Sequence, residues 1–264
     1  MDQVHNHHHP TKLEYFDDMW KLHSDATFLY RFQTQDGGQA LILDSTIFHP
    51  QGGGQPSDAG FIIIPDSPIK FIVEDVRSKN GIVYHYGHAE NSEGVVLEWM
   101  IEIGTKVQLL VDESRRQFNS RLHSAGHLLD ICIRNVGLGH LDSEKGKGYH
   151  FPDGPFVEYK GTIPQTDLQN KLEELEREAN ALISRGGKVY ASELPYEAAA
   201  EICGGRLPDY IPKDSNPRIV KLGENFGCPC GGTHVRDISD IRSIKVSKIR
   251  TKKGMTKVSY SISP

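Results

Sequence analysis

Two short stretches of this 264-residue chain place side chains that can bind a metal four positions apart. One stretch contains His123 and His127, and the other contains Cys230 and His234. Three imidazoles and one thiolate form a donor set that suits Zn²⁺. Either pair alone is a weak signal, because histidines at this spacing are often ordinary surface or packing residues. Together, the two pairs predict a single metal site built from segments about a hundred residues apart.

The segment around the second pair supports this interpretation and leaves its role open. Gly231 and Gly232 let the backbone bend so that Cys230 and His234 can face one point. Cys228 is a competing ligand, although the proline between the two cysteines stiffens the link. Four protein ligands normally mean a closed, structural site. The length of the chain, which can fold without a metal, and the glycine-rich loops around the motifs, which could admit a ligand, oppose a structural ion, although the spacing alone does not exclude it.

The residue that follows His123 excludes one class of enzyme. A zinc protease with two histidines at this spacing places glutamate directly after the first histidine, where it acts as the general base. This chain has Ser124 there. The pattern therefore argues against peptide hydrolysis of that kind.

The first histidine pair lies in a predicted helix that runs to about residue 136. Asp112 is a plausible N-cap, and Gly137 and Gly139 end the helix. An apolar stripe at spacings of three and four consists of Phe118, Leu122, Ala125, Leu129, Cys132 and Val136. Both histidines lie beside this stripe on one face. The helix is therefore expected to pack by one side and to hold two imidazoles at its edge.

The residues before this helix, about 27–111, show a β pattern. Segments 28–34 and 40–43 flank Asp36-Gly37-Gly38, and segments 71–76 and 82–86 flank Lys79-Asn80-Gly81. Both are hairpin signals. Further strands are predicted at 61–64 and 107–111. This pattern favours a small barrel or sandwich, and the change to helical periodicity predicts two domains, 1–111 and 112–264.

The loop at residues 49–60, HPQGGGQPSDAG, contains three consecutive glycines, Gly52, Gly53 and Gly54. Consecutive glycines cost backbone entropy that a plain loop need not lose. The loop is either a flexible turn or a segment whose bare backbone closely approaches a ligand or another domain.

The remaining residues alternate between helical and β patterns. We expect a strand at 156–159, a helix with its apolar face from 168 to 182, strands at 189–194 and 218–222, and a hairpin at 241–262. The hairpin is basic and contains no acidic residue. Its cations are Arg242, Lys245, Lys248, Arg250, Lys252, Lys253 and Lys257.

The composition limits the possible partners and the cell compartment. A net charge of −5 and a pI near 6.2 do not indicate a nucleic-acid-binding protein, so any such role must rest on a local patch. The apolar runs are too short to cross a membrane. Four cysteines are too few for a disulfide scaffold, which favours a reducing, cytoplasmic setting. The histidine cluster at residues 5–9 has alternative readings as a weak metal site or a tag remnant, and we expect it to be a disordered tail.

Four segments of the chain resemble the alanyl-tRNA editing domain. They are HSAGHLL (123–129), CGGTHV (230–235), GGGQPSDAG (52–60) and KGYHFPDGPFVEYKG (147–161). This domain occurs inside alanyl-tRNA synthetase and as free-standing proteins of the AlaX group. The resemblance extends from about residue 13 to 262, and the glycine-rich segment is similar to that of the longer free-standing form. The paired ligand motifs are shared with threonyl-tRNA synthetase editing domains, so they indicate the reaction class better than the amino acid removed.

The resemblance implies an α+β fold, with a small N-terminal β-barrel followed by a two-layer editing domain of antiparallel sheet and helices. It implies that His123, His127, Cys230 and His234 bind one Zn²⁺ per chain. The enzyme would hydrolyse the ester that joins serine, or glycine, to alanine tRNA. The chain is too short to carry a synthetase's aminoacylation module as well, so it would act in trans on mischarged tRNA in the cytoplasm.

Further site residues follow from the same motifs. Candidate catalytic residues are Tyr149, His150 and Gln55, with the Gly52–Gly54 loop as a pocket wall. His150 has an alternative reading as a satisfied structural histidine. Candidates for binding the acceptor end of tRNA are Arg115, Arg116, Arg121, Lys245, Lys248 and Arg250. The hairpin cations have an alternative reading as a merely charged outer face.

Two other functions compete with the deacylase. One is a zinc-stabilised RNA-binding module without activity, and the other is a metal hydrolase acting on small esters. The sequence does not indicate an oligomeric state.

Overall fold

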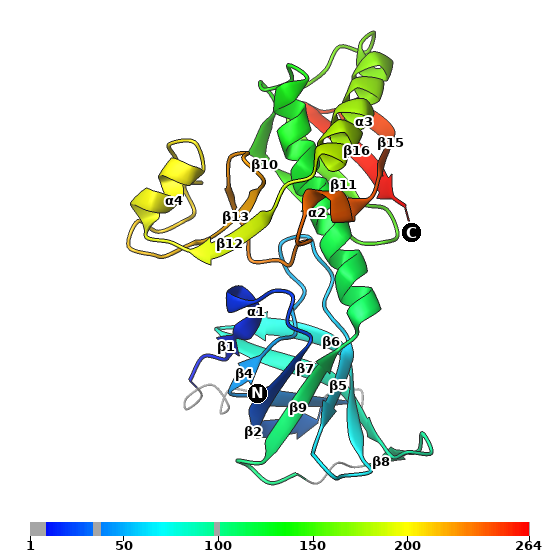
Figure 1. Ribbon diagram of the computed structural model, residues 1–264, viewed down its shortest axis with the longest axis vertical. Coiled ribbons are helices and arrows are strands. Elements are labelled where there is room, and N and C mark those ends of the chain that lie inside the picture. Colours follow the sequence, from blue (N-terminus) through cyan, green and yellow to red (C-terminus); the bar gives the residue numbers. More distant parts are fainter. Residues whose placement is uncertain (1–8, 34–37, 98–100, 264) are drawn as a thin grey trace. The chain divides into compact units, whose positions relative to one another are not determined.

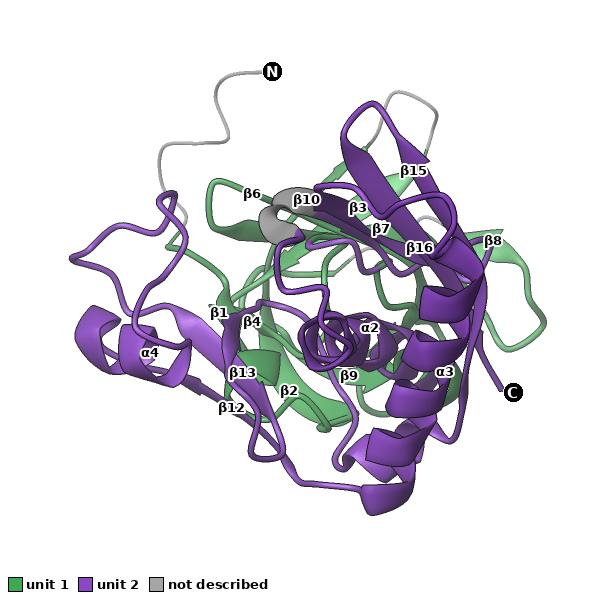
Figure 2. Cartoon of the chain, turned by 90° about the horizontal axis from the view of Figure 1, so that it is seen from above, with its two compact units in different colours: residues 1–52, 56–116 green, residues 53–55, 117–264 purple. Residues whose placement is uncertain are grey.

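A computed structural model describes residues 9–33, 38–97 and 101–263 of the chain. The histidines at 5–8 and part of the first predicted hairpin turn, Asp36-Gly37, lie outside these ranges. The chain forms two compact units, which Figure 2 colours separately. The first comprises residues 1–52 and 56–116, and the second comprises residues 53–55 and 117–264.

The first unit is a closed β-barrel. Its strands, in spatial order, are β3 (Gln39–Leu43), β2 (His23–Gln33), β9 (Lys106–Val111), β5 (Gly60–Ile63), β6 (Lys70–Lys79) and β7 (Ile82–Glu90). Every neighbouring pair is antiparallel, and β3 also pairs with β7, which closes the barrel. The short β8 (Val96–Leu97) extends β7 at its edge. The predicted small barrel is confirmed.

Alternation along the barrel strands fills the interior with apolar side chains. Phe28, Leu41, Phe71 and Leu109 are all at most 2% exposed. The β6–β7 hairpin turns at Asn80 and Gly81, with φ values of 53° and 77°. Positive φ at both central residues is the geometry that an Asn-Gly pair adopts most readily. The short elements β1 (Lys12–Leu13), α1 (Glu14–Asp17) and β4 (Ser45–Thr46) complete this unit.

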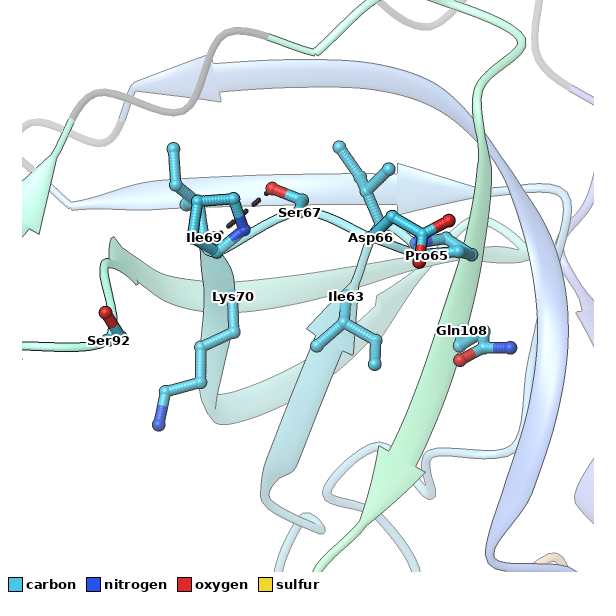
Figure 3. Close-up of a pocket in the computed structure, with 10 residues that line it drawn as sticks. Ile63, Pro65, Asp66, Ser67, Ile69, Lys70, Ser92 and Gln108 are labelled. Atoms are coloured by element: carbon cyan, nitrogen blue, oxygen red, sulfur yellow. Dashed lines mark hydrogen bonds between the residues drawn. The ribbon is translucent and has the colours of Figure 1, made fainter.

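A shallow pocket opens at the turn between β5 and β6 (Figure 3). It measures about 540 Å³ and is lined by residues 63–70 with Ser92 and Gln108. The turn is held by Ser67, whose hydroxyl accepts a bond from the Ile69 amide at 3.2 Å. The lining contains neither histidine nor cysteine, so it offers no donor set of the kind predicted around His123.

The second unit contains a four-stranded antiparallel sheet covered by two helices. The strand order is β10 (Asp142–Tyr149), β11 (Phe156–Lys160), β16 (Met255–Ile262) and β15 (Ile244–Lys252). Helices α2 (Glu113–Asn135) and α3 (Leu168–Arg185) lie on one side of it (Figure 2). The Tyr159 hydroxyl donates to Asp130 on α2 at 2.7 Å, and Asn180 on α3 donates to the Ile244 carbonyl at 2.8 Å. The predicted two-layer α+β architecture is confirmed.

Helix α2 follows the last barrel strand directly (Figure 1). The Asp112 carboxylate accepts a bond from the Arg115 amide at 3.0 Å, as an N-cap does, so this prediction is confirmed. Leu122, Ala125 and Leu129 of the predicted stripe are at most 2% exposed. The division between the units falls inside this helix, after Arg116. The domain boundary at 111/112 stays a prediction.

A smaller sheet leads the chain to the second ligand pair. It contains β12 (Val189–Glu193), β13 (Arg218–Leu222) and β14 (Cys228–Pro229) in that order. Helix α4 (Tyr196–Ile202) lies between β12 and β13 in sequence, and the 3₁₀ helix η2 (Ile238–Ile241) follows β14. Among the described residues, no helix combines the length and the apolar composition that crossing a membrane requires.

Candidate metal centre

The four predicted ligands meet at one point in the second unit. Their candidate donor atoms all lie within 4.8 Å of one another. The Nε2 atoms of His123 and His127 are 3.1 Å apart. The Cys230 Sγ lies 3.3 Å from His234 Nε2 and 3.6 Å from His123 Nε2. Three imidazole nitrogens and one sulfur therefore converge, as the motif spacing predicted.

Local structure explains why the two segments can meet. His123 and His127 project from one face of α2 because they are four residues apart on a helix. Cys230 follows β14, and its amide donates to the Arg218 carbonyl at 3.0 Å. The Arg218 guanidinium also donates to the carbonyls of Cys230 and Gly232, at 2.8 and 2.9 Å. A Cβ on Gly232 would lie 2.2 Å from His123 Cε1, so this position requires glycine.

The outward-facing nitrogens of the imidazoles contact other side chains. His123 Nδ1 lies 2.7 Å from Gln55 Oε1, and His234 Nδ1 lies 3.0 Å from Ser124 Oγ. The amide oxygen of Gln55 can only accept, so His123 must carry its proton on Nδ1 and present a lone pair on Nε2. Gln55 is itself held by Thr233, whose amide donates to Oε1 at 2.9 Å and whose hydroxyl accepts from Nε2 at 2.8 Å. Partners of this kind orient histidines that bind metals.

Burial sets the protonation of the cluster. His123 and His234 are 1% and 0% exposed. Burial lowers the pKa of His127 to about 4, which leaves its imidazole neutral near pH 7. Burial raises the pKa of the Cys230 thiol, because an unpaired buried thiolate is unfavourable. A divalent cation would stabilise that thiolate and use the neutral nitrogens. The donor chemistry of these four residues therefore fits Zn²⁺.

Cys228 does not belong to this group of four. Its Sγ lies 2.9 Å from His127 Nδ1, on the other side of that ring from Nε2. Cys228 is paired with Val220 in the small sheet, which fixes the direction of its side chain. The competition for the metal that the sequence left open therefore favours Cys230.

His150 lies against the cluster. Its ring stacks on His123 with centroids 4.7 Å apart, and it is 4% exposed. The Tyr260 hydroxyl donates to the Leu122 carbonyl at 2.9 Å and therefore accepts from His150 Nδ1 at 2.7 Å. Burial, reinforced by His127, lowers the pKa of His150 to about 3. A neutral imidazole with an acceptor at Nε2 thus forms one wall of the site.

Tyr149 is the last residue of β10 and precedes His150. Its hydroxyl donates to Asp153 at 2.9 Å, and its ring stacks on Phe151 and Phe156. The catalytic roles assigned from the sequence to Tyr149, His150 and Gln55 stay predictions. The structure brings His150 and Gln55 to the cluster and points the Tyr149 hydroxyl to Asp153.

The glycine-rich loop supplies residues 53–55 to the second unit. Gly54 has φ +80°, and a Cβ there would lie 2.4 Å from the Gly148 carbonyl oxygen. Its own carbonyl accepts from the His150 amide at 2.8 Å. At Gly54 the loop approaches another backbone segment closely, which agrees with the second of its two readings. At Gly53 a Cβ would meet nothing within 4 Å, so this reading does not extend to that position.

The predicted tRNA-binding arginines differ in exposure. Arg116 is 3% exposed and pairs with Asp58 within the first unit. Arg121 is 9% exposed and donates to the carbonyls of Ile241 and Ser263. Burial leaves neither guanidinium available to phosphate. Arg115 is exposed, as are Lys245, Lys248 and Arg250 on β15.

A cavity of about 310 Å³ borders the cluster. Its α2 lining is His127, Asp130, Ile131, Arg134 and Asn135, and its other wall is formed by Leu222 and residues 224–228. Burial raises the pKa of Asp130 to about 6, although the hydroxyl of Tyr159 and the charge of Arg134 oppose this shift. One of the four candidate ligands, His127, therefore lines a cavity rather than being enclosed on all sides.

Several residues that shape the site were not predicted. Ser124, Thr233 and Tyr260 act through contacts with segments distant in sequence, and Arg218 acts through the carbonyl of Cys230, 12 residues away. Gly126 did carry a signal, since a glycine in a helix interior often marks a close approach. A Cβ there would lie 2.3 Å from His150 Cε1.

Known proteins resemble the chain over most of its length. Residues 1–115 match the family described as tRNA synthetases class II (A), and residues 218–257 match the threonyl and alanyl tRNA synthetase second additional domain. The alanyl-tRNA editing protein AlaX-L of Pyrococcus horikoshii is 30% identical over 240 residues, which cover 90% of this chain and 54% of that protein. AlaX-M of Methanosarcina barkeri is 28% identical, with 92% and 94% covered.

Alanine–tRNA ligases also match. That of Methanosarcina mazei is 27% identical over 256 residues, which cover 95% of this chain and 26% of the ligase. The chain thus spans about half of the AlaX-L protein and about a quarter of the ligase. These matches confirm the resemblance predicted from the motifs: the chain is similar to the alanyl-tRNA editing proteins and to the matching part of the alanine–tRNA ligases.

Proposed function

We propose that this chain is a zinc-dependent deacylase that acts in trans on mischarged alanine tRNA. Its substrate would be alanine tRNA that carries an ester-linked serine or, as a second amino acid, glycine. The observation that carries the proposal is the convergence of three Nε2 atoms and one Sγ beside a cavity. The relationship to alanyl-tRNA editing proteins supports the choice of substrate.

His123, His127, Cys230 and His234 would hold one Zn²⁺. When bound, the ion supplies positive charge that can polarise a carbonyl or position water or an α-amino group. Four protein ligands favour the positioning role over a catalytic site with an open coordination position. The ester of an aminoacyl-tRNA is already activated, so modest assistance is sufficient for its hydrolysis.

The chain's own residues would prepare the site. Gln55 holds His123 in the tautomer that leaves Nε2 as a ligand. His150 covers one face of His123, and the Gly54 carbonyl fixes the His150 backbone. Recognition of serine requires a group that bonds its hydroxyl, because a purely apolar pocket discriminates poorly against an added hydroxyl. We assign this task to the wall formed by His150, Gln55 and the Gly52–Gly54 loop.

Binding of the tRNA would use exposed cations. Lys245, Lys248 and Arg250 lie on β15, and Arg115 is exposed at the start of α2. Such side chains neutralise backbone phosphates and make binding sensitive to salt. We place the reaction in the cytoplasm, in keeping with four cysteines that are all free.

A second candidate function is a zinc-stabilised RNA-binding module without activity. The set of four protein ligands favours it, because such a set is typical of structural zinc. A metal hydrolase acting on small esters would also use this cluster. The candidates differ in what is released from charged tRNA.

One deacylation assay tests the proposal. Alanine tRNA charged with serine, glycine or alanine is incubated with the purified protein, with the chelated protein and with the zinc-reloaded protein. Zinc-dependent release of serine supports a deacylase. Binding without release supports the RNA-binding module, and hydrolysis of small esters alone supports the third function.

Two variants sharpen the result. Cys230→Ala should lose zinc and turnover while keeping most of its helical circular dichroism. Cys203→Ala is the matched control, because that thiol lies outside the group of four. If Cys230→Ala instead unfolds the protein, the ion is structural and the proposed positioning role is wrong.

A further inference from the structure

The four-stranded sheet of the second unit carries aromatic and basic side chains on the side opposite its helices. Tyr159 and Tyr260 point toward α2, so the alternate residues of β11 and β16 point the other way. Strand pairing aligns these outer residues in rows. One row is Tyr149, Phe156, Ser259 and Lys248, and the next is Lys147, Glu158, Lys257 and Arg250.

Aromatic rings form a stack at one end of this face. Tyr149 and Phe151 have centroids 4.5 Å apart and an interplanar angle of 12°. Tyr149 and Phe156 have centroids 5.4 Å apart and an angle of 21°. The Lys257 ammonium lies 3.3 Å from the centroid of Phe156. All three rings are partly exposed.

The strands that carry the stack also carry exposed cations, which outnumber the carboxylates of Glu158 in the outer row and of Asp153 beside Tyr149. Lys147, Lys160, Lys248, Arg250 and Lys252 are exposed on the same four strands. None of them forms an ion pair with another described residue. The chain as a whole carries a net charge of −5, so this is a local basic face on an acidic protein. Such a face fits a polyanion.

The combination of rings and cations distinguishes between two kinds of nucleic acid. A duplex offers phosphates and groove edges, and cations alone would bind it. Unpaired nucleotides also expose base faces, which stack on aromatic side chains while Lys and Arg bind the phosphates. We propose that the outer face of this sheet binds the unpaired 3′-terminal nucleotides of tRNA, with a base extending the stack of Tyr149, Phe151 and Phe156.

The position of this face relative to the cluster supports the proposal. Tyr149 and Phe151 flank His150, whose ring packs on His123. One three-residue segment therefore presents rings on one side and forms the wall of the metal centre on the other. Nucleotides stacked on these rings would lie beside the segment that carries His150. The identity of the RNA as tRNA rests on the proposed function; the preference for unpaired nucleotides rests on the rings and charges.

The test measures binding of uncharged alanine tRNA with an intact 3′ end and of the same tRNA trimmed of its unpaired 3′ nucleotides. A second probe carries 2-aminopurine as the terminal base, because its fluorescence is quenched by stacking. The wild type should bind the intact tRNA roughly tenfold more tightly than the trimmed tRNA and quench the probe. The double variant Tyr149→Leu with Phe151→Leu should lose both effects.

Two further variants control for folding and for the ring itself. Tyr190→Leu removes an aromatic side chain that is 59% exposed on β12, outside this face, and should keep the preference for the intact tRNA. Tyr149→Phe keeps the ring and loses only the hydroxyl, and should also keep this preference. Zinc content and thermal unfolding show whether the double variant remains folded.

The outcomes separate this proposal from the deacylase itself. Binding of uncharged tRNA needs no hydrolysis, so Cys230→Ala should keep the preference for the intact 3′ end. If the wild type releases no amino acid yet retains that preference, the deacylase is wrong and the stacking face stands. If the folded double variant binds intact tRNA as the wild type does and quenches the probe equally, the stacking face is wrong, whatever the deacylation result.

Discussion

Both units bury polar side chains, and they satisfy them in different ways. In the barrel, Arg116 and Asp58 are 3% and 0% exposed and form an ion pair. The same guanidinium donates to the carbonyls of Met19 and Ile47. His85, which is fully buried, lies 2.8 Å from the Thr46 hydroxyl and 3.1 Å from the Leu41 carbonyl. The buried donors of Arg116 and His85 therefore face acceptors.

The cluster of the second unit lacks that balance. Protein partners contact the outward-facing Nδ1 atoms of His123 and His234, but the inward-facing Nε2 atoms and the Cys230 sulfur face one another. Lone pairs that converge in a buried site require a proton or a cation between them. Burial of polar groups is therefore structural where donors match acceptors, and points to a ligand where acceptors converge.

The strongest test of this comparison removes one converging nitrogen. His234→Ala should reduce zinc from one ion per chain to none and lower deacylation to roughly a thousandth, which corresponds to about 4 kcal/mol. Atomic absorption and the deacylation assay measure the two effects. Gln55→Ala removes only the partner of the outer nitrogen of His123. It should lower the zinc affinity or the deacylation rate by roughly 10- to 100-fold. Full zinc retention in His234→Ala would show that the convergence does not define a metal site.

The converse test removes a matched pair in the barrel. Arg116→Met leaves Asp58 buried without its partner and should destabilise the protein by about 3 kcal/mol. Urea unfolding measures this loss, and zinc content should not change. The double variant Arg116→Met with Asp58→Leu should recover part of the stability, because no buried charge then remains. Loss of zinc from the folded single variant would contradict the assignment of this pair to the barrel alone.

A buried histidine of the barrel provides a pH test. Burial lowers the pKa of His85 from 6.5 to about 4. Between these values, the unfolded chain binds a proton that the folded barrel does not, so stability is fully present above pH 6.5 and is lost as pH falls toward 4. His85→Leu has no such proton to bind. The stability difference between wild type and variant should therefore shrink by on the order of 2 kcal/mol across this window.

Unfolding followed at pH 7.5, 6, 5 and 4 gives this difference directly. Comparison of the two proteins cancels the acid sensitivity of the zinc ligands, which both contain. A difference that stays constant with pH would mean that His85 keeps its ordinary pKa in the folded barrel.

The elements that local chemistry determines were predictable from sequence. Asp112 caps α2 through its own carboxylate, and Asn80-Gly81 forms the hairpin turn because those residues accept positive φ. The common direction of His123 and His127 was also predictable, since positions four apart share a helix face. Each of these features depends on residues that lie close together in the sequence.

What could not be predicted depends on distant segments. Gln55 is fixed by Thr233, 178 residues away, and no local pattern announces that contact. Arg116 and Arg121 were expected to bind phosphate because they lie near the first ligand motif, yet the carbonyls of Ile47 and Ile241 are among their acceptors. The direction of the Tyr149 hydroxyl depends on Asp153 and on where the strand ends.

Gly126 offers the smallest and most local test of the wall around the cluster. Alanine has the higher helix propensity, by about 1 kcal/mol, so Gly126→Ala would stabilise an open helix position. Here the new methyl group would lie 2.3 Å from His150 Cε1, and the helix cannot move away without displacing His123. Overpacking should therefore prevail and destabilise the protein by about 1 to 2 kcal/mol.

Gly139→Ala, where a Cβ meets nothing within 4 Å, is the matched control and should change stability by less than about 0.5 kcal/mol. Equal stability of the two variants would mean that His150 can leave His123, and that the wall is not fixed.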